Sequence, residues 1–224
     1  GFPADTPASA LMPLASRIHP EDREFALAQF VRHLKSEEPV RSELRLRAKD
    51  GSYRWINADG ISQHGPDGRA VRSIGAISDI TDLKEREAEI KRLALHDPLT
   101  GLPNRRLFED RLEFALTGAR RNRSSVAVML IDLDGFKSIN DQFGHDAGDE
   151  MLRAVSQRLR DTIRASDTVA RTGGDEFVVI AEGAVTREAI RQLAEKILAT
   201  LCKPVSWQDH SLSVGSSIGI AVYP

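Results

Sequence analysis

The sequence has 224 residues, a hydrophobic content of 41%, a charged content of 29% and a formal net charge of -2 at pH 7. This length is enough for one large or two ordinary domains, and the near-neutral charge argues against binding to nucleic acid or to an anionic membrane surface. No apolar run approaches the roughly 20 residues of a membrane helix, the first residues do not form a signal peptide, and the single cysteine, Cys202, fits a reducing cytoplasm.

The first 82 residues are expected to form one α+β unit. His19-Pro20-Glu21-Asp22 predicts the start of a helix, whose apolar pattern ends near Pro39. Alternating or apolar residues then predict a three-stranded meander, in which Asp50-Gly51 makes the first turn. The strand-like segments are 40–48, 53–56 and 71–80.

The segments HPEDRE, RAKDGSYRWI and GAISDITDLKERE resemble the C-terminal half of a PAS domain, over residues 18–85. A PAS domain encloses a ligand or passes on the signal of a partner. The histidines of this half, His19, His33 and His64, lack metal-ligand spacing, and His19 is expected at a helix start rather than on a haem. Tyr53 and Trp55 are expected to be packing residues, so the sequence does not name the signal.

Residues 83–96 predict a charged linker helix. Four acidic residues, counting Asp82 just before this range, and four basic residues surround an apolar stripe, which consists of Leu83, Ile90, Leu93 and Ala94. Leu83 and Ile90 are one heptad apart, which leaves two interpretations open. One is a stalk that pairs two chains and couples the first unit to the next, and the other is a solvated linker.

From Asp97 onward, helical and strand-like patterns alternate. The predicted elements are a helix after Asn104, a strand at 125–131, a helix at 151–163, a hairpin around 171–177, a helix capped by Thr186 and a strand at 211–223. This order fits a sheet covered on one face by helices, as in ferredoxin-like or polymerase-palm domains.

Two acidic elements are expected to meet in that sheet. Arg171-Thr172-Gly173-Gly174-Asp175-Glu176-Phe177 predicts a β-hairpin with an acidic tip, which a ligand can approach because glycine has no Cβ. Asp132 directly follows the apolar strand and precedes a loop and a helix start, an arrangement typical of phosphate and Mg²⁺ sites. If this strand lies beside the hairpin, Asp132 and Asp175 come together, which suits a shared divalent cation. The alternatives are a hairpin that is merely acidic and a capping aspartate.

The segments HDPLTGLPNRR, IDLDGFKSINDQFGHDAGDE and RTGGDEFVVI, in this order, resemble the signatures of the GGDEF family, the diguanylate cyclases, over residues 95–224. The resemblance implies synthesis of cyclic di-GMP from two GTP molecules: each 3′-hydroxyl attacks the other molecule's α-phosphorus, and pyrophosphate leaves. One chain would hold one GTP, so catalysis is expected to require a homodimer.

The resemblance assigns roles to particular residues. The expected ligands of Mg²⁺ or Mn²⁺ are Asp132, the backbone carbonyl of Leu133, and Asp175. The expected substrate contacts are Phe136, Lys137, Asn140, His145 and Asp149. An amide and a carboxylate suit guanine, and Lys137 would neutralise phosphate charge during in-line displacement. An ordinary aspartate is a poor base at neutral pH, so Asp175 is interpreted as a ligand of the metal, which acidifies the hydroxyl. Glu176 is expected to be a second ligand or a partner of the phosphates.

Arg164 and Asp167 precede the hairpin with the spacing R-x-x-D. The resemblance implies a product-inhibition site here, because arginine binds guanine or phosphate and aspartate accepts the donors of guanine. An exposed ion pair between residues i and i+3 is the alternative.

The resemblance divides the chain into a partial PAS domain at 1–82, a helical linker at 83–96 and a GGDEF domain at 97–224. A further helix with phosphate-binding basic residues would follow Pro224, so the GGDEF domain is expected to be C-terminally truncated and weakly active or inactive by itself. The lack of an initial Met likewise predicts a piece of a longer protein.

Two other functions stay open. A catalytically silent GGDEF domain binds GTP or cyclic di-GMP and regulates an attached EAL phosphodiesterase or a partner. A PAS-mediated dimerisation module would form a stable dimer with no dependence on nucleotide.

Overall fold

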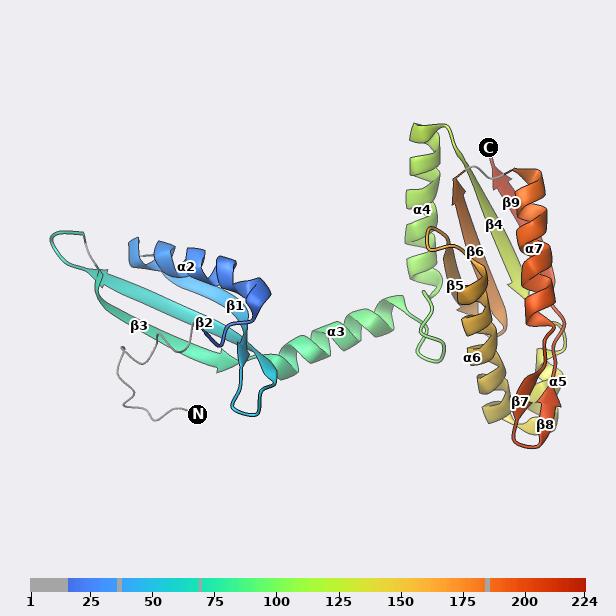
Figure 1. The fold of residues 1–224 in the computed structure, drawn as a ribbon, viewed down its shortest axis with the longest axis horizontal. Helices are drawn as coiled ribbons and strands as arrows, with labels where there is room; N and C mark the ends of the chain where they lie inside the picture. The colour runs from blue at the N-terminus through green and yellow to red at the C-terminus, as the bar shows by residue number, and fades with distance from the viewer. Residues whose placement is uncertain (1–15, 36–37, 69, 184–185) are drawn as a thin grey trace. The chain divides into compact units, whose positions relative to one another are not determined.

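The computed structural model describes residues 16–35, 38–68, 70–183 and 186–224. The chain divides into two compact units, Gly1–Ile90 and Lys91–Pro224. The division falls inside helix α3 (Thr81–Leu95), shown in Figure 1. The domain limits expected at 82 and 97 stay a prediction.

The N-terminal unit consists of an antiparallel sheet in the order β1-β2-β3 and a helix that packs on it (Figure 1). The strands are β1 (Val40–Arg47), β2 (Tyr53–His64) and β3 (Ala70–Asp79). A short 3-10 helix, η2 (Pro20–Asp22), leads into α2 (Arg23–Lys35). His19 caps η2, since its Nδ1 accepts a hydrogen bond from the backbone N–H of Glu21 at 3.3 Å. The expected helix start and meander are confirmed.

The core of this unit is small. Ala26 of α2 packs with Leu44 and Ile56, which face each other across the β1–β2 ladder. Two cations lie close to the Trp55 ring, with the Arg45 guanidinium carbon 5.4 Å and Lys84 Nζ 5.9 Å from the ring centroid. Trp55 is therefore a packing residue, as expected.

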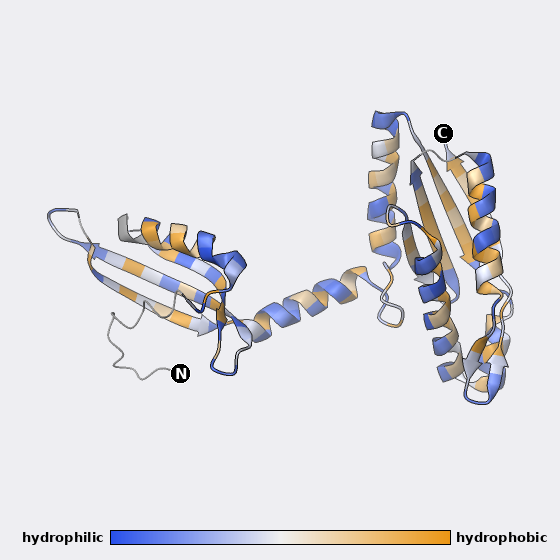
Figure 2. Ribbon diagram, in the orientation of Figure 1, coloured by the Kyte–Doolittle hydropathy of each residue, from blue (hydrophilic) through white to orange (hydrophobic). Residues whose placement is uncertain are grey.

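Helix α3 has no buried residue in the part of the chain that the structure describes. Its apolar residues Leu83, Ile90 and Leu93 are 53%, 66% and 49% exposed. Figure 2 shows hydrophobic positions alternating with hydrophilic ones along α3. Pairing of this stripe with a second chain stays a prediction.

The C-terminal unit is organised around an antiparallel sheet in the order β5-β6-β4-β9. Its strands are β4 (Ser125–Asp132), β5 (Thr168–Gly173), β6 (Glu176–Gly183) and β9 (Ser217–Tyr223). The central pair is the most apolar: Met129, Ile131, Phe177 and Val179 are fully buried. Figure 2 shows this hydrophobic centre, which confirms the α+β fold with a buried central sheet.

Helices lie on both faces of this sheet, so the expectation of helices on one face only is wrong. The helices α5 (Phe136–Phe143), α6 (His145–Thr162) and α7 (Arg187–Leu201) share the larger core with Ala127, Met129 and Ile131 of β4. Helix α4 (Arg105–Asn122) instead packs through Ala115 and Ala119 against Val126 and Ile180. Val126 and Ile180 point to the sheet face opposite the larger core, because side chains alternate between the two faces along a strand.

The caps of two helices agree with the sequence. Asn104 Oδ1 accepts the backbone N–H of Leu107 at 3.1 Å, and Thr186 Oγ1 accepts that of Ala189 at 3.2 Å. The single strand expected at 211–223 is wrong. A short hairpin of β7 (Val205–Trp207) and β8 (His210–Leu212) comes first, and β9 begins at Ser217.

Candidate functional site

The acidic hairpin is the centre of the candidate site. Strand β5 ends at Gly173, β6 begins at Glu176, and Gly174-Asp175 forms the two-residue turn. Neither Gly173 nor Gly174 has a positive φ, so this turn does not need glycine for its backbone conformation. A Cβ on Gly174 would meet nothing within 4 Å. The glycine therefore leaves the backbone beside Asp175 open to a ligand.

Strand β4 lies beside β6, as the sequence predicts, and its end lies at the hairpin tip. Asp132 faces Glu176 in the β4–β6 register, and Asp175 is the next residue on the turn. Residues opposite each other in antiparallel strands lie about 4.5–5.5 Å apart at Cα or Cβ. The fold thus places Asp132, Asp175 and Glu176 at one end of the sheet.

The loop after β4 leads directly into α5. Leu133 is buried, and its carbonyl accepts the N–H of Phe136 at 3.3 Å, which leaves a second lone pair of that oxygen free. Phe136 is only 8% exposed and belongs to the hydrophobic core, so a contact between its ring and a nucleotide stays a prediction. Lys137, next in the chain, is exposed in the first turn of α5.

Asn140 and Asp149 lie where α5 and α6 pack together. Both are half-buried, and within the described chain neither side chain has a hydrogen-bond or ion-pair partner. The Asn140 carboxamide lies directly against Gly148 of α6, which precedes Asp149. His145 lines a different hollow of about 400 Å³, with Phe143, Trp207 and His210. The structure therefore places Asn140 against the residue that precedes Asp149, and His145 beside the β7–β8 hairpin.

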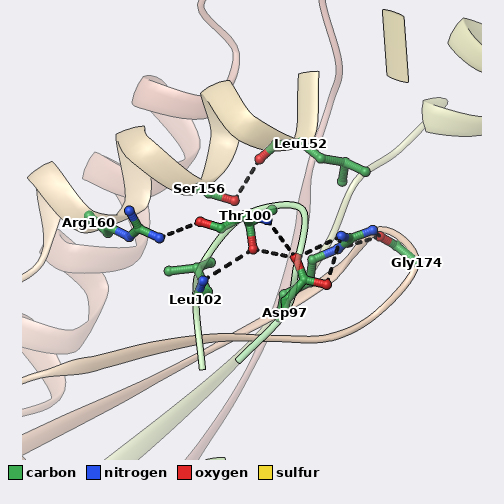
Figure 3. A network of polar contacts seen from close by, with 8 residues as sticks. Asp97, Thr100, Leu102, Leu152, Ser156, Arg160 and Gly174 are labelled. Carbon is green, nitrogen blue, oxygen red and sulfur yellow. Dashed lines mark hydrogen bonds and ion pairs between the residues drawn. The ribbon is translucent and has the colours of Figure 1, made fainter. Parts of the chain in front are cut away.

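An ion pair that the sequence did not predict holds the hairpin tip. Arg171 Nη1 lies 3.0 and 3.1 Å from the two carboxylate oxygens of Asp97, while Nε and Nη2 donate to the Gly174 carbonyl at 3.0 and 2.7 Å. Figure 3 shows Asp97, Thr100 and Gly174 in this network. The pattern Asp97-Pro98-Leu99-Thr100 signals the turn at Asp97, because aspartate commonly caps a turn of this kind, but it does not signal the pairing with Arg171.

The carboxylate of Asp97 accepts hydrogen bonds from both Thr100 and Arg171. Burial raises its pKa, but the hydroxyl and N–H of Thr100, at 2.6 and 2.8 Å, and the Arg171 guanidinium more than offset this and hold the pKa below its usual value. Thr100 is itself held by Arg160 of α6, which donates to its carbonyl. The first residues after α3 are thereby joined to α6 and to the hairpin tip.

A second arginine contacts the other side of the turn. Arg105 Nε donates to the Thr172 carbonyl at 3.3 Å, and its Nη2 lies 3.8 Å from Glu176 Oε2. Arg105 and Arg171 also line a hollow of about 530 Å³ next to Gly173 and Gly174. Two guanidinium groups therefore bind the backbone carbonyls of Thr172 and Gly174, just before Asp175.

Arg164 and Asp167 form a tight turn rather than a side-chain ion pair. Asp167 Oδ2 accepts the backbone N–H of Arg164 at 3.1 Å, and the Asp167 N–H donates to the Arg164 carbonyl at 3.0 Å. In the described residues, no ion pair joins the two side chains, so the alternative of an i,i+3 pair is wrong. The Arg164 side chain is exposed and is available to a ligand.

The donor set at the hairpin tip suits a hard divalent cation. Two aspartates and a backbone carbonyl offer oxygen ligands of the kind that Mg²⁺ and Mn²⁺ prefer. Within 16–35, 38–68, 70–183 and 186–224, no three His, Cys, Asp or Glu side chains are arranged to hold a metal. The expected ligand set needs only two carboxylates and one backbone carbonyl, so the residues present fit a divalent cation. Nor does the described chain contain a helix long and apolar enough to cross a bilayer.

Two family models match the chain. The model described as the diguanylate cyclase GGDEF domain matches residues 94–224, and the model described as the PAS fold matches residues 1–77. MucR of Pseudomonas aeruginosa, named a bifunctional diguanylate cyclase/cyclic di-GMP phosphodiesterase, is 46% identical over 144 residues, which cover 64% of this chain and 21% of MucR. The chain spans about a fifth to a quarter of the first curated relatives it matches.

Solved structures are similar to the C-terminal unit. The GGDEF domain of TpbB from Pseudomonas aeruginosa is 45% identical with a TM-score of 0.56, and the match covers 58% of this chain and 76% of that one. The coiled coil and GGDEF domain of DgcB from Caulobacter crescentus, solved in complex with c-di-GMP, is 26% identical with a TM-score of 0.59, covering 65% of this chain and 78% of that one.

Proposed function

Because the chain belongs to the GGDEF family of diguanylate cyclase domains and carries a PAS fold before it, we propose that its parent protein joins two GTP molecules into cyclic di-GMP. The observation that carries the proposal is the β4–β6 register, which sets Asp132 opposite Glu176 beside the Asp175 turn. The expected basic and polar groups follow on α5 and α6.

Each half-reaction forms one phosphodiester bond. The 3′-oxygen of one GTP attacks the α-phosphorus of the other, the bond to pyrophosphate breaks, and the hydroxyl proton leaves to solvent. Asp132, Asp175 and the Leu133 carbonyl would hold a divalent cation, which when bound would neutralise phosphate charge and lower the pKa of the attacking hydroxyl. Lys137 adds a positive charge beside the phosphates.

Asn140 and Asp149 are proposed to bind the base. Guanine presents one acceptor and two donors along one edge, while an aspartate accepts and an amide does both. Their lack of partners within the described chain supports this, since half-buried polar groups are normally satisfied by protein, water or ligand. Glu176, which Arg105 approaches, is proposed as a second cation ligand or a partner of the phosphates.

The active unit is proposed to be a homodimer, located in the cytoplasm. One chain supplies one set of these groups, whereas the reaction needs two GTP molecules facing each other. The exposed stripe of α3 offers a surface for pairing. The exposed Arg164 and the Asp167 turn are proposed to bind product, which would make cyclic di-GMP an inhibitor.

The test is product formation by the full-length protein from GTP and Mg²⁺, compared with Asp175→Ala. We expect cyclic di-GMP from the unmodified protein and none from the variant. Asp161→Ala is the matched control, because Asp161 is exposed on α6 and, among the described residues, accepts a hydrogen bond from Gln157 alone. GTP or cyclic di-GMP binding without turnover at high protein concentration would contradict the cyclase and support a regulatory GGDEF domain. A stable dimer that binds no nucleotide would support a dimerisation module.

A further inference from the structure

Gly148, in the first turn of α6, is the residue on which this inference rests. A Cβ built on it would lie closer to Asn140 Oδ1 than any real non-bonded contact, 2.9 Å from Asn140 Cγ and 3.2 Å from Phe136 Cζ. Gly148 does not have a positive φ, so its backbone conformation is open to any residue. The three atoms nearest to that Cβ belong to Asn140 and Phe136 of α5, and their closeness favours a glycine here.

A second helical glycine, Gly118, serves as a comparison because no side chain stands where its Cβ would lie. Gly118 lies inside α4, and a Cβ there would meet nothing within 4 Å. Alanine is the better helix former, so replacing a helical glycine with open space around it stabilises a protein. At Gly148 the same replacement would force the Asn140 carboxamide to move, because the obstacle is a side chain rather than solvent.

The displaced group belongs to the proposed base site. Asn140 and Asp149 are both half-buried and have no side-chain partner within the described residues; Gly148 lies against Asn140 and directly precedes Asp149 in α6. The missing side chain of Gly148 lets the carboxamide lie against the first turn of α6, the helix that also carries Asp149. An amide on α5 and a carboxylate near the start of α6 match a purine edge that carries both an acceptor and donors.

We propose that Gly148 is a positioning residue that sets base specificity, by holding the Asn140 carboxamide beside Asp149 so that guanine is preferred over adenine. The inference rests on the proposed function. It assigns no contact with the nucleotide to Gly148 itself, which acts only through Asn140.

The test measures binding of α,β-methylene analogues of GTP and ATP to the full-length protein by calorimetry, because neither analogue can be turned over. We expect Gly148→Ala to weaken binding of the GTP analogue about tenfold, as for the loss of one or two hydrogen bonds, and to reduce the preference for guanine. Gly118→Ala, the matched control, should leave both affinities unchanged.

Two further variants separate positioning from packing. Asn140→Ala removes the group that Gly148 is proposed to position, so the double variant Gly148→Ala/Asn140→Ala should bind no more weakly than Asn140→Ala alone. The double variant also relieves the overlap, and it should fold even if Gly148→Ala does not. Circular dichroism checks folding in each case.

Three outcomes overturn the inference alone, and a fourth overturns it together with the proposed function. An unchanged guanine preference in Gly148→Ala would refute it, and so would additive losses in the double variant. If neither the single nor the double variant folds, Gly148 serves packing against Phe136 and not the base site. Absence of GTP-analogue binding by the unmodified protein would instead refute the proposed function, and this inference with it.

Discussion

Replacing Asp97 by Asn tests whether the residues after α3 hold the hairpin tip. The substitution keeps the shape of the side chain but removes its charge and replaces one acceptor oxygen by a donor. Asp97 accepts two hydrogen bonds from Thr100 and two from Arg171, and the Arg171 and Asp97 side chains are only 13% and 18% exposed. The change therefore leaves a nearly buried guanidinium without its counter-charge.

The expected loss of stability follows from that burial. Removing one partner of a fully buried ion pair costs about 3–5 kcal/mol. Because both groups keep some solvent contact and Arg171 retains the Gly174 carbonyl, we expect about 2–3 kcal/mol for Asp97→Asn. For a unit of this size, the melting temperature should fall by roughly 6–12 °C.

The loss should also depend on pH. The folded-state pKa of Asp97 lies below its unfolded value, so the ionised carboxylate stabilises the protein above the unfolded pKa, and this stability is lost as the pH falls through the folded pKa. The difference between the two proteins should be full at pH 7 and should shrink below about pH 4.

Urea unfolding of the full-length protein at several pH values measures both effects. Asp161→Asn, which changes an exposed aspartate of α6, serves as the control and should shift stability by less than about 0.5 kcal/mol. This reasoning would be refuted if Asp97→Asn were as stable as the unmodified protein at pH 7, or if its loss of stability did not vary with pH.

Two other changes test separate features. Arg164→Ala should weaken binding of cyclic di-GMP about tenfold or more in a calorimetric titration, because the exposed guanidinium would lose its contacts with the product; unchanged affinity would remove Arg164 from the product site. Asn104→Ala should lower the free energy of unfolding by about 1 kcal/mol, since the cap of α4 is lost. Chemical denaturation measures it, and no change would mean that water replaces the cap.

Local features of this protein were predictable from the sequence. His19, Asn104 and Thr186 cap helices, as expected, because a cap depends on a side chain and backbone N–H groups within three residues. The hairpin around Gly174-Asp175 and its neighbour β4 also agree with prediction, since apolar strand patterns and a turn pair specify them. The α+β class followed from the order of these elements.

The sequence did not predict the short β7–β8 hairpin. Its strands are three residues each, too short for an alternating pattern, and its turn includes Gln208 with a φ of 51°. A non-glycine residue in the left-handed region gives no sequence signal of a turn. The predicted strand at 211–223 therefore ran through a segment that the structure divides between β8 and β9.

Only the tertiary structure decided which sheet face α4 covers, that Arg171 pairs with Asp97 and that Gly148 lies against Asn140. An amphipathic pattern shows that a helix has a buried side but does not say which sheet face receives it. Asp97 and Arg171 are 74 residues apart, and no local rule links them. Caps and turns are determined by backbone geometry over a few residues, whereas these contacts arise only when packing brings distant segments together.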